Sequence, residues 1–162
     1  MTIPAYLWLK DDSGAAILGS VDVAGREGSI EILGLNHCVM LPTDDVTGKL
    51  TARREHAPFN FDKEIDASSP YLYKAVASGQ KLHSAEVKFY RINDAGWEVE
   101  YFNVLMEAVT VISAGPVMYD VKSCYGKKHN HLDLIELMYE KITWRYLDGT
   151  IIHSDSWSGT KA

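Results

Sequence analysis

The sequence predicts a mainly-β protein: a closed or nearly closed β-barrel of two sheets, with one short flanking α-helix at about residues 69–78. Long stretches of alternating apolar and polar residues are joined by turn segments, which is the pattern of antiparallel strands. Only one stretch of the 162 residues carries clear helix signals. A chain of this length holds one sizeable core and this one has no internal repeat, so we expect a single domain over residues 1–162.

The predicted helix is defined by the residues at its ends. Ser69 has the hydroxyl that an N-cap residue uses to accept an amide hydrogen bond, and Pro70 suits the first helical position because its missing N–H needs no partner there. Gly79 suits the left-handed residue that ends many helices. The apolar residues between them share one face: Leu72, Ala75 and Val76. A helix this short needs a surface to pack on, and we expect that surface to be the sheet.

Three strands are expected before the helix, over residues 5–10, 28–41 and 53–65. Apolar side chains on both faces of residues 28–41 favour a strand that is covered on both sides, with a bulge at Gly34. Strict alternation in residues 53–65 indicates one buried and one wet face. The expected buried residues are Ala57, Phe59, Phe61 and Ile65. The expected solvent-facing residues are His56, Asn60, Asp62 and Glu64.

After the helix, residues 84–92 and 97–112 are expected to form a hairpin around the turn 93–96. One face of the second strand should hold Val99, Tyr101, Leu105, Val109 and Val111. The other face should hold Glu98, Glu100, Phe102, Val104 and Met106. The rest of the chain is expected to be irregular over 114–130, a long strand over 131–146, a short strand over 150–153 and a frayed polar tail from Ser154 to Ala162.

Composition excludes several classes of protein. The formal net charge of -6 argues against nucleic-acid binding, which relies on Lys and Arg side chains contacting phosphates. No apolar run approaches the length of a membrane span, and the N-terminus lacks the basic and apolar regions of a secretory signal. We therefore expect a protein that is made in the cytoplasm and leaves it only by a signal-independent route. Cys38 and Cys124 fit no metal spacing. We interpret them as two free buried thiols, because a disulfide would require an oxidising compartment.

The chain shows no catalytic motif. His129-Asn130-His131 is the one dense candidate, since His129 and His131 would face the same way on a strand and hold a metal. Spacing identifies no third ligand, which favours two solvent-exposed histidines, but a metal-dependent enzyme or small-ligand barrel centred on this pair stays the alternative. The remaining histidines are interpreted as surface or hydrogen-bonded residues: His37, His56, His83 and His153. We predict no catalytic, cofactor-binding or metal-binding residue and no cofactor.

Residues 42–52 form a polar excursion with a turn signal at Thr47-Gly48. The segment is either a plain surface connection or a flexible hairpin arm that reaches a neighbouring subunit. The second interpretation assigns an inter-subunit role to its first seven residues: Pro42, Thr43, Asp44, Asp45, Val46, Thr47 and Gly48. It also answers a problem that every β-protein has, because an unpaired sheet edge tends to pair with another chain.

Five segments together make the sequence resemble the Hcp family, the haemolysin-coregulated tube proteins of bacterial type VI secretion. They are Pro42-Thr43-Asp44 with Thr47-Gly48, His56-Ala57-Pro58-Phe59, Ser69-Pro70-Tyr71-Leu72-Tyr73 running to Ser78-Gly79, Glu86-Val87-Lys88-Phe89-Tyr90-Arg91, and Glu140-Lys141-Ile142-Thr143-Trp144. Each segment alone is unspecific, but their order and spacing are characteristic. The resemblance extends from Pro4 to about Trp157.

The resemblance implies a structural protein and not an enzyme. Members of this family have a two-sheet β-barrel, form hexameric rings with copies of themselves, and stack these rings into a hollow tube inside a contractile sheath. The tube carries a spike protein at its tip, holds small effector proteins in its lumen, and is exported without a signal peptide. The resemblance implies neither nucleic-acid binding nor membrane insertion.

One segment departs from the family pattern. Family members often carry a polar Thr-Lys-Leu-Glu-Asn run after the aromatic pair, whereas here Tyr101-Phe102-Asn103 is followed by Val104-Leu105-Met106-Glu107-Ala108. If these apolar residues were exposed on a ring, they would change its contacts with neighbouring subunits or with the sheath.

Overall fold

The structure is a computed structural model that describes residues 3–157, within which the chain forms twelve strands, one α-helix and one short 3-10 helix. The strands that precede the α-helix are β1 (Ala5–Lys10), β2 (Ala16–Ile17), β3 (Ile30–Ile32), β4 (Gly34–Asn36), β5 (Val39–Met40), β6 (Glu55–His56) and β7 (Phe59–Glu64). The remaining elements are α1 (Ser69–Ser78), β8 (Lys81–Ile92), β9 (Glu98–Val117), η1 (Gly126–Lys128), β10 (Leu132–Met138), β11 (Lys141–Tyr146) and β12 (Ile151–Ser156). The prediction of a mainly-β protein with one helix is confirmed.

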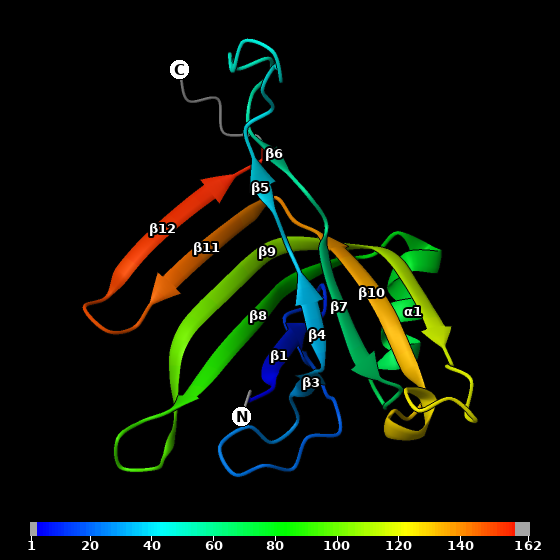
Figure 1. Cartoon of the computed structure of the whole chain (residues 1–162). Helices are drawn as coiled ribbons and strands as arrows, with labels where there is room; N and C mark the ends of the chain where they lie inside the picture. The colour runs from blue at the N-terminus through cyan, green and yellow to red at the C-terminus, as the bar shows by residue number, and fades with distance from the viewer. Residues whose placement is uncertain (1–2, 158–162) are drawn as a thin grey trace.

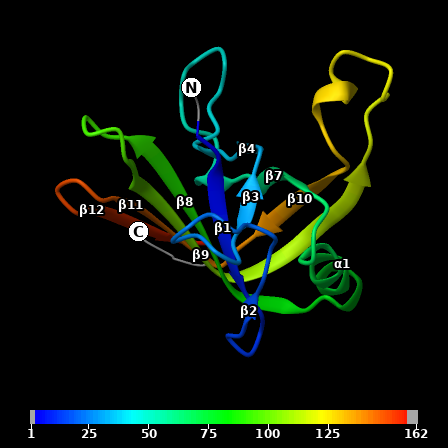
Figure 2. The ribbon, with the colours of Figure 1, turned by 90° about the horizontal axis from the view of Figure 1, so that it is seen from below.

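Ten strands form one antiparallel sheet, and β5 and β6 form a separate pair, in the part of the chain that the structure describes. The main path of the sheet runs β2-β1-β8-β9-β10-β7-β4. Strand β9 pairs with β8 on one side and, on its other side, first with β11 and then with β10. The β11–β12 hairpin therefore lies on the opposite side of the molecule from α1 (Figures 1 and 2).

The segment from β3 to β4 pairs with two strands that are far apart along this path. β3 pairs with β1, and β4 pairs with β7. Between them, the Leu33 amide donates a 2.9 Å hydrogen bond to the Asp62 carbonyl of β7. The prediction of one continuous strand over residues 28–41 is therefore wrong, because the chain changes partner at Leu33, one residue before the expected bulge.

The expected cover on both faces of residues 28–41 is also wrong. Ile30 and Ile32 are buried in the core, as their shared face requires. The apolar residues of the other face are exposed: Leu33, Leu35, Val39 and Leu41. The described part of the chain therefore leaves these four side chains exposed.

The alternation predicted for β9 fails at Ala108. Val104 and Met106 are buried, but after Ala108 the buried residues are Val109 and Val111, which have the opposite parity. Ala108 has φ of 51°, a left-handed conformation that interrupts the pleat of the strand and reverses which side chains face the core. In the segment that departs from the family pattern, Val104 and Met106 thus belong to the core, whereas Leu105 is half-buried.

Helix α1 packs on the far half of β9, with Leu72 and Ala75 in the core. Val76 is 37% exposed, so its predicted burial is wrong. The N-cap is Ser68 and not Ser69, whose hydroxyl instead accepts a hydrogen bond from the Asp66 amide. Gly79 ends the helix in the predicted left-handed conformation.

The single strand predicted over residues 53–65 is divided into β6 and β7, and its burial differs from the prediction near both ends. His56, expected in solvent, is 5% exposed, and Ile65, expected in the core, is 47% exposed. Lys63 continues the buried face that begins at Phe59 and Phe61. The burial of this lysine depends on partners from other elements, which a strand pattern alone does not reveal.

The C-terminal strands are longer and more divided than expected. The predicted strand over 131–146 is interrupted at Tyr139 and Glu140, where the chain passes from β10 to β11. β12 extends to Ser156, so the tail predicted to fray from Ser154 is ordered at its start; residues 158–162 lie outside the described residues. Cys38 and Cys124 are free but exposed, which corrects their predicted burial. In the described part of the chain, no helix is long and apolar enough to cross a membrane.

Candidate functional site

Residues 37–57 form a hairpin, here called the arm, that extends away from the main sheet (Figure 1). Near its base, Val39 pairs with His56 and Met40 with Glu55. Further out, an isolated bridge joins Thr43 and Leu50. The expectation of a surface loop or hairpin arm over residues 42–52 is thus confirmed as a hairpin, and all seven residues from Pro42 to Gly48 lie in its outer part.

The arm's tip is ordered by its own hydrogen bonds. The Asp44 carboxylate accepts hydrogen bonds from the Val46 and Thr47 amides, at 2.8 and 2.9 Å, and these bonds lower the pKa of Asp44. The Gly48 amide donates to the Asp44 carbonyl, and Gly48 has φ of 69°, which favours glycine. The tip therefore has a defined turn that displays its side chains outward.

Those side chains include an unusual number of exposed apolar groups. Val46 at the tip is 93% exposed, the highest value among the large apolar residues of the described chain. The other exposed apolar residues of the arm are Val39, Met40, Leu41 and Leu50. A projecting hairpin with this composition is typical of a contact surface for another protein.

The arm's root is a polar cluster that joins four segments of the chain. The Tyr139 hydroxyl lies 2.8 Å from His37 Nε2 and 2.6 Å from His56 Nδ1. On its other side, His56 Nε2 lies 2.7 Å from the Asp155 carboxylate of β12. Arg54 donates to the same carboxylate at 2.5 Å and to the Ser156 carbonyl at 2.9 Å. We call these five side chains the root cluster: His37, Arg54, His56, Tyr139 and Asp155.

Electrostatics in the root cluster follow from burial and from these contacts. Hydrogen bonding to Arg54, and then to His56, lowers the pKa of Asp155 to about 2, so it is a carboxylate at neutral pH. Burial, with a further contribution from Asp155, raises the pKa of Tyr139, so its hydroxyl keeps its proton. Burial and the proximity of His56 lower the pKa of His37. The cluster fixes the arm to the body of the molecule.

Sequence reasoning missed this cluster. The sequence predicts surface or hydrogen-bonded residues at His37 and His56 and no link between them. In the structure both contact Tyr139, which lies 102 and 83 positions away in the sequence. Their partners come from the β10–β11 junction and from β12, so no local spacing indicates the contact. The prediction of hydrogen-bonded histidines is confirmed for this pair.

The alternative site at His129 and His131 gains no support. Within residues 3–157, no group of three or more His, Cys, Asp or Glu side chains is placed to hold a metal ion. His129 packs against the Tyr125 and Tyr119 rings, with centroids 4.4 and 6.2 Å away. His131 is exposed, and its carbonyl accepts a hydrogen bond from the Ile65 amide. Both histidines border a cleft that Glu64 also lines.

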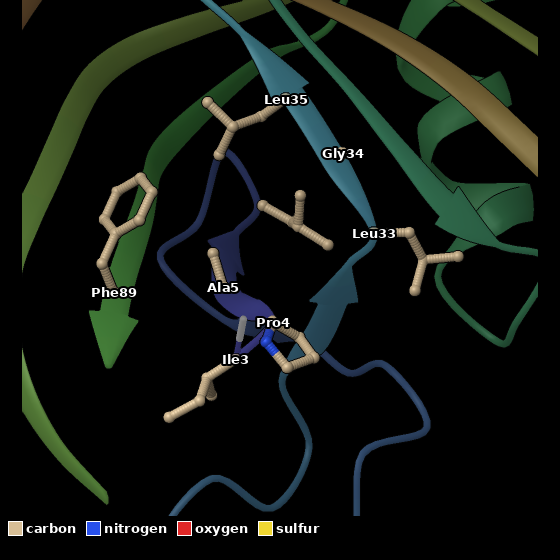
Figure 3. A pocket seen from close by; sticks show the side chains of 8 residues that line it. Ile3, Pro4, Ala5, Leu33, Gly34, Leu35 and Phe89 are labelled. Atoms are coloured by element: carbon tan, nitrogen blue, oxygen red, sulfur yellow. The ribbon is translucent and has the colours of Figure 1, made fainter. Parts of the chain in front are cut away.

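A second apolar feature lies at the other end of the molecule from the arm. A groove of about 300 Å³ opens between β8 and β4, with Phe89 on one side and Leu35 on the other (Figure 3). Ile3 and Pro4 form its lower border. Its lining is apolar and offers neither a charged group nor a nucleophile, so it suits packing and not chemistry.

Comparisons with known proteins agree with this geometry. Residues 6–146 match the family model described as "Type VI secretion system effector, Hcp". The chain is 28% identical to the major exported protein of Pseudomonas aeruginosa, with 97% of this chain and 96% of that protein covered.

Solved structures give the same result. A double mutant of the Hcp1 protein from the E. coli EAEC 042 pathovar is 62% identical, with a TM-score of 0.88 over 96% of this chain and 99% of that one. The secreted protein Hcp3 from Pseudomonas aeruginosa is 25% identical, with a TM-score of 0.78 over 96% of this chain and 99% of that one. The family match spans residues 6–146 and the fold is shared over 96% of the chain, so the chain belongs to the Hcp family of type VI secretion proteins.

Proposed function

We propose that this chain is the structural subunit of a type VI secretion inner tube and has no enzymatic activity. Six copies form a ring, rings stack into a hollow tube inside a contractile sheath, and the tube is exported with a spike protein at its tip. Small effector proteins travel in the lumen. The subunit is made in the cytoplasm and leaves through the secretion apparatus without a signal peptide. The observation that carries this proposal is the arm, together with membership of the Hcp family.

We further propose that the chain is a single domain whose sheet closes into a barrel, which would suit this role. Strands β1 and β7 lie near opposite ends of the sheet path, and the β3–β4 segment pairs with both. We infer that this segment closes β1, β8, β9, β10 and β7 into a barrel, which removes most free edges. A closed barrel suits a ring subunit, because the barrel keeps its shape when neighbouring subunits bind.

The arm supports contact between subunits. A two-stranded hairpin is marginally stable by itself in water, and this one has five large apolar side chains exposed. Its strands β5 and β6 pair only with each other among the described strands, so their outer backbone edges are available to a neighbour. We therefore assign residues Pro42–Gly48 to an inter-subunit contact, in the ring or between stacked rings.

The experiment that tests this proposal shortens the arm. Because Thr43 and Leu50 already pair across the hairpin, an Asn-Gly turn can replace residues 44–49 and keep the strands joined. Size-exclusion chromatography with light scattering and negative-stain electron microscopy then compare the two proteins. We expect ring-sized particles and tubes from the natural chain, and weakened rings or stacks from the shortened one.

The matched control is the exposed β8–β9 turn, in which Asp94→Ala and Trp97→Ala remove side chains without shortening the hairpin. A natural chain that stays monomeric at micromolar concentration would contradict the tube proposal. Rings and tubes that survive arm shortening unchanged would contradict the assignment of Pro42–Gly48 alone.

A further inference from the structure

The Tyr139 hydroxyl in the root cluster lies between two histidine rings. It has one proton to donate and two lone pairs that accept, and it is hydrogen-bonded to His37 Nε2 and His56 Nδ1. Tyr139 and His56 are both buried, so water does not replace a lost partner easily. The number of protons on the two rings therefore decides whether every group in the cluster is satisfied.

We propose that the root cluster is a proton-operated latch, which holds the arm while at most one of His37 and His56 is charged and releases it when both are charged. All residues of the latch come from one chain, so its opening and closing do not require a neighbouring subunit. Its consequence, that acidification loosens contacts made by the arm, rests on the proposed tube function.

The neutral cluster satisfies every hydrogen bond. His56 Nε2–H donates to the Asp155 carboxylate, which leaves Nδ1 to accept from the Tyr139 hydroxyl. The oxygen of Tyr139 then accepts from His37 Nε2–H. The arm is therefore fixed at both sides of its base, at His37 just before β5 and at His56 in β6.

The root cluster keeps all of its hydrogen bonds when one proton is added to His56. When His56 is charged, both of its ring nitrogens donate, and its charge is compensated by the Asp155 carboxylate at 2.7 Å. Tyr139 then accepts from His56 and turns its own proton to His37 Nε2, which accepts as the lone-pair nitrogen of a neutral ring. The direction of the chain is reversed, but no partner is lost.

The root cluster loses a hydrogen bond when a second proton charges His37 as well. With both rings charged, both facing nitrogens donate to the Tyr139 oxygen, and the Tyr139 proton has no acceptor left between them. Two like charges also face each other across one hydroxyl, which is unfavourable in a buried site. The simplest relief is separation of His37 from Tyr139, which frees one strand of the arm at its base.

The surrounding charges leave His37 as the residue that controls the second step. From the segment before β6, Arg54 faces Asp155, and Glu55 of β6 is exposed. From the β10–β11 junction, Glu140 is exposed and pairs with Lys81. From the β4–β5 connection, Cys38 is exposed. Asp155 contacts His56 and not His37, and the lowered pKa of His37 reflects burial and its neighbour His56.

Hydrogen–deuterium exchange of the full-length protein at pH 7.5 and pH 5 tests the latch. The probe is the Ala57 amide, which donates a 2.9 Å hydrogen bond to the Cys38 carbonyl across the base of the arm. After correction for the intrinsic exchange rate, we expect its protection to fall roughly tenfold at pH 5, the effect of one buried hydrogen bond. Titration of the histidine ring resonances by NMR should place this loss at the protonation of His37.

The decisive variant is His37→Gln, whose amide offers Tyr139 either a donor or an acceptor and takes up no proton. It should retain protection at pH 5. His153→Gln is the matched control, because His153 is exposed on β12 and stacks on Trp144 outside the cluster; it should behave as the natural chain.

Three results would overturn the latch: constant protection in the natural chain, an equal loss in His37→Gln, or a loss that does not follow the ring titration of His37. Light scattering at the same two pH values separates this test from the proposed function. A protein that forms tubes but keeps a pH-independent arm contradicts only the latch, and a pH-sensitive arm on a permanent monomer contradicts only the tube.

Discussion

Lys63 Nζ lies 3.1 Å from Asp133 Oδ2, and both side chains are completely buried. The ammonium also donates to the Glu64 carbonyl and to Ser69 Oγ, at 2.8 and 2.9 Å. Ser69 and Tyr73 of α1 donate to the same aspartate. Although burial alone would raise it, the pKa of Asp133 is lowered by these hydrogen bonds, so Asp133 is a carboxylate that joins α1 to β7 and β10.

Removing this lysine should be strongly destabilising. Lys63→Met leaves a buried carboxylate without its counter-ion, which costs about 3–5 kcal/mol in the free energy of unfolding. Urea denaturation followed by circular dichroism measures the change. Lys81→Met is the matched control, because Lys81 pairs with Glu140 at the surface, where an ion pair contributes under about 1 kcal/mol. Equal effects of the two substitutions would show that the buried pair does not stabilise the helix.

A second prediction concerns the reversal of β9. Ala108→Gly should raise the free energy of unfolding by up to about 1 kcal/mol, because φ of 51° strains alanine and not glycine. Ala108→Val should be destabilising, since a β-branched side chain tolerates this conformation worst. The same denaturation experiment measures both.

The control substitution is expected to change the free energy of unfolding in the opposite direction. Ala114 lies in the same strand, outside the positive-φ residues, so Ala114→Gly should lower stability. If Ala108→Gly also lowered stability, that result would contradict the left-handed conformation assigned to Ala108.

The buried Lys63–Asp133 pair and the reversal at Ala108 are both features that local sequence patterns do not reveal. Strand β1, the helix and the β8–β9 hairpin were predictable because alternation, Pro70 and Gly79 act on near neighbours. Gly34 predicted an irregularity beside Leu33, but not the change of partner there. The interruptions at Ala108 and Tyr139 were not predictable either, because each is a place where a strand changes its partner. At Leu33 the partner changes from β1 to β7, and near Ala108 it changes from β11 to β10.

The candidate site divides in the same way. The polar composition of residues 42–52 and the turn at Thr47-Gly48 predicted a surface excursion, which the arm confirms. The root cluster was hidden, because its members come from distant segments and carry no shared spacing. Burial of Lys63 was hidden for the same reason, since its acceptor Asp133 lies 70 positions away.

A third prediction tests whether Tyr139 holds the arm. Tyr139→Phe keeps the ring in the core but removes the hydroxyl that contacts His37 and His56. Leaving buried His56 without this partner should lower the free energy of unfolding by about 1–3 kcal/mol. Hydrogen exchange of residues 37–57 should also accelerate at neutral pH. A matched control is Tyr71→Phe on the exposed face of α1, which should change neither quantity.

A fourth prediction concerns Asp155 and acid. Its pKa of about 2 lies below the ordinary value of about 4 for an unfolded aspartate. The folded state therefore binds this proton less readily than the unfolded state does. The resulting stability is fully present above about pH 4 and is lost as pH falls towards 2. Because the side chain is partly solvated, we expect about 1 kcal/mol from this source.

The measurement compares Asp155→Asn with the natural chain across this pH range. At pH 7 the variant should unfold at lower urea concentration, because Arg54 and His56 lose a charged partner. The difference should shrink between about pH 4 and pH 2, since the natural carboxylate is then protonated and resembles the amide. Asp94→Asn, in the exposed β8–β9 turn, is the control and should show no such convergence. A difference that stays constant down to pH 2 would mean that the carboxylate acts through shape and not through its charge.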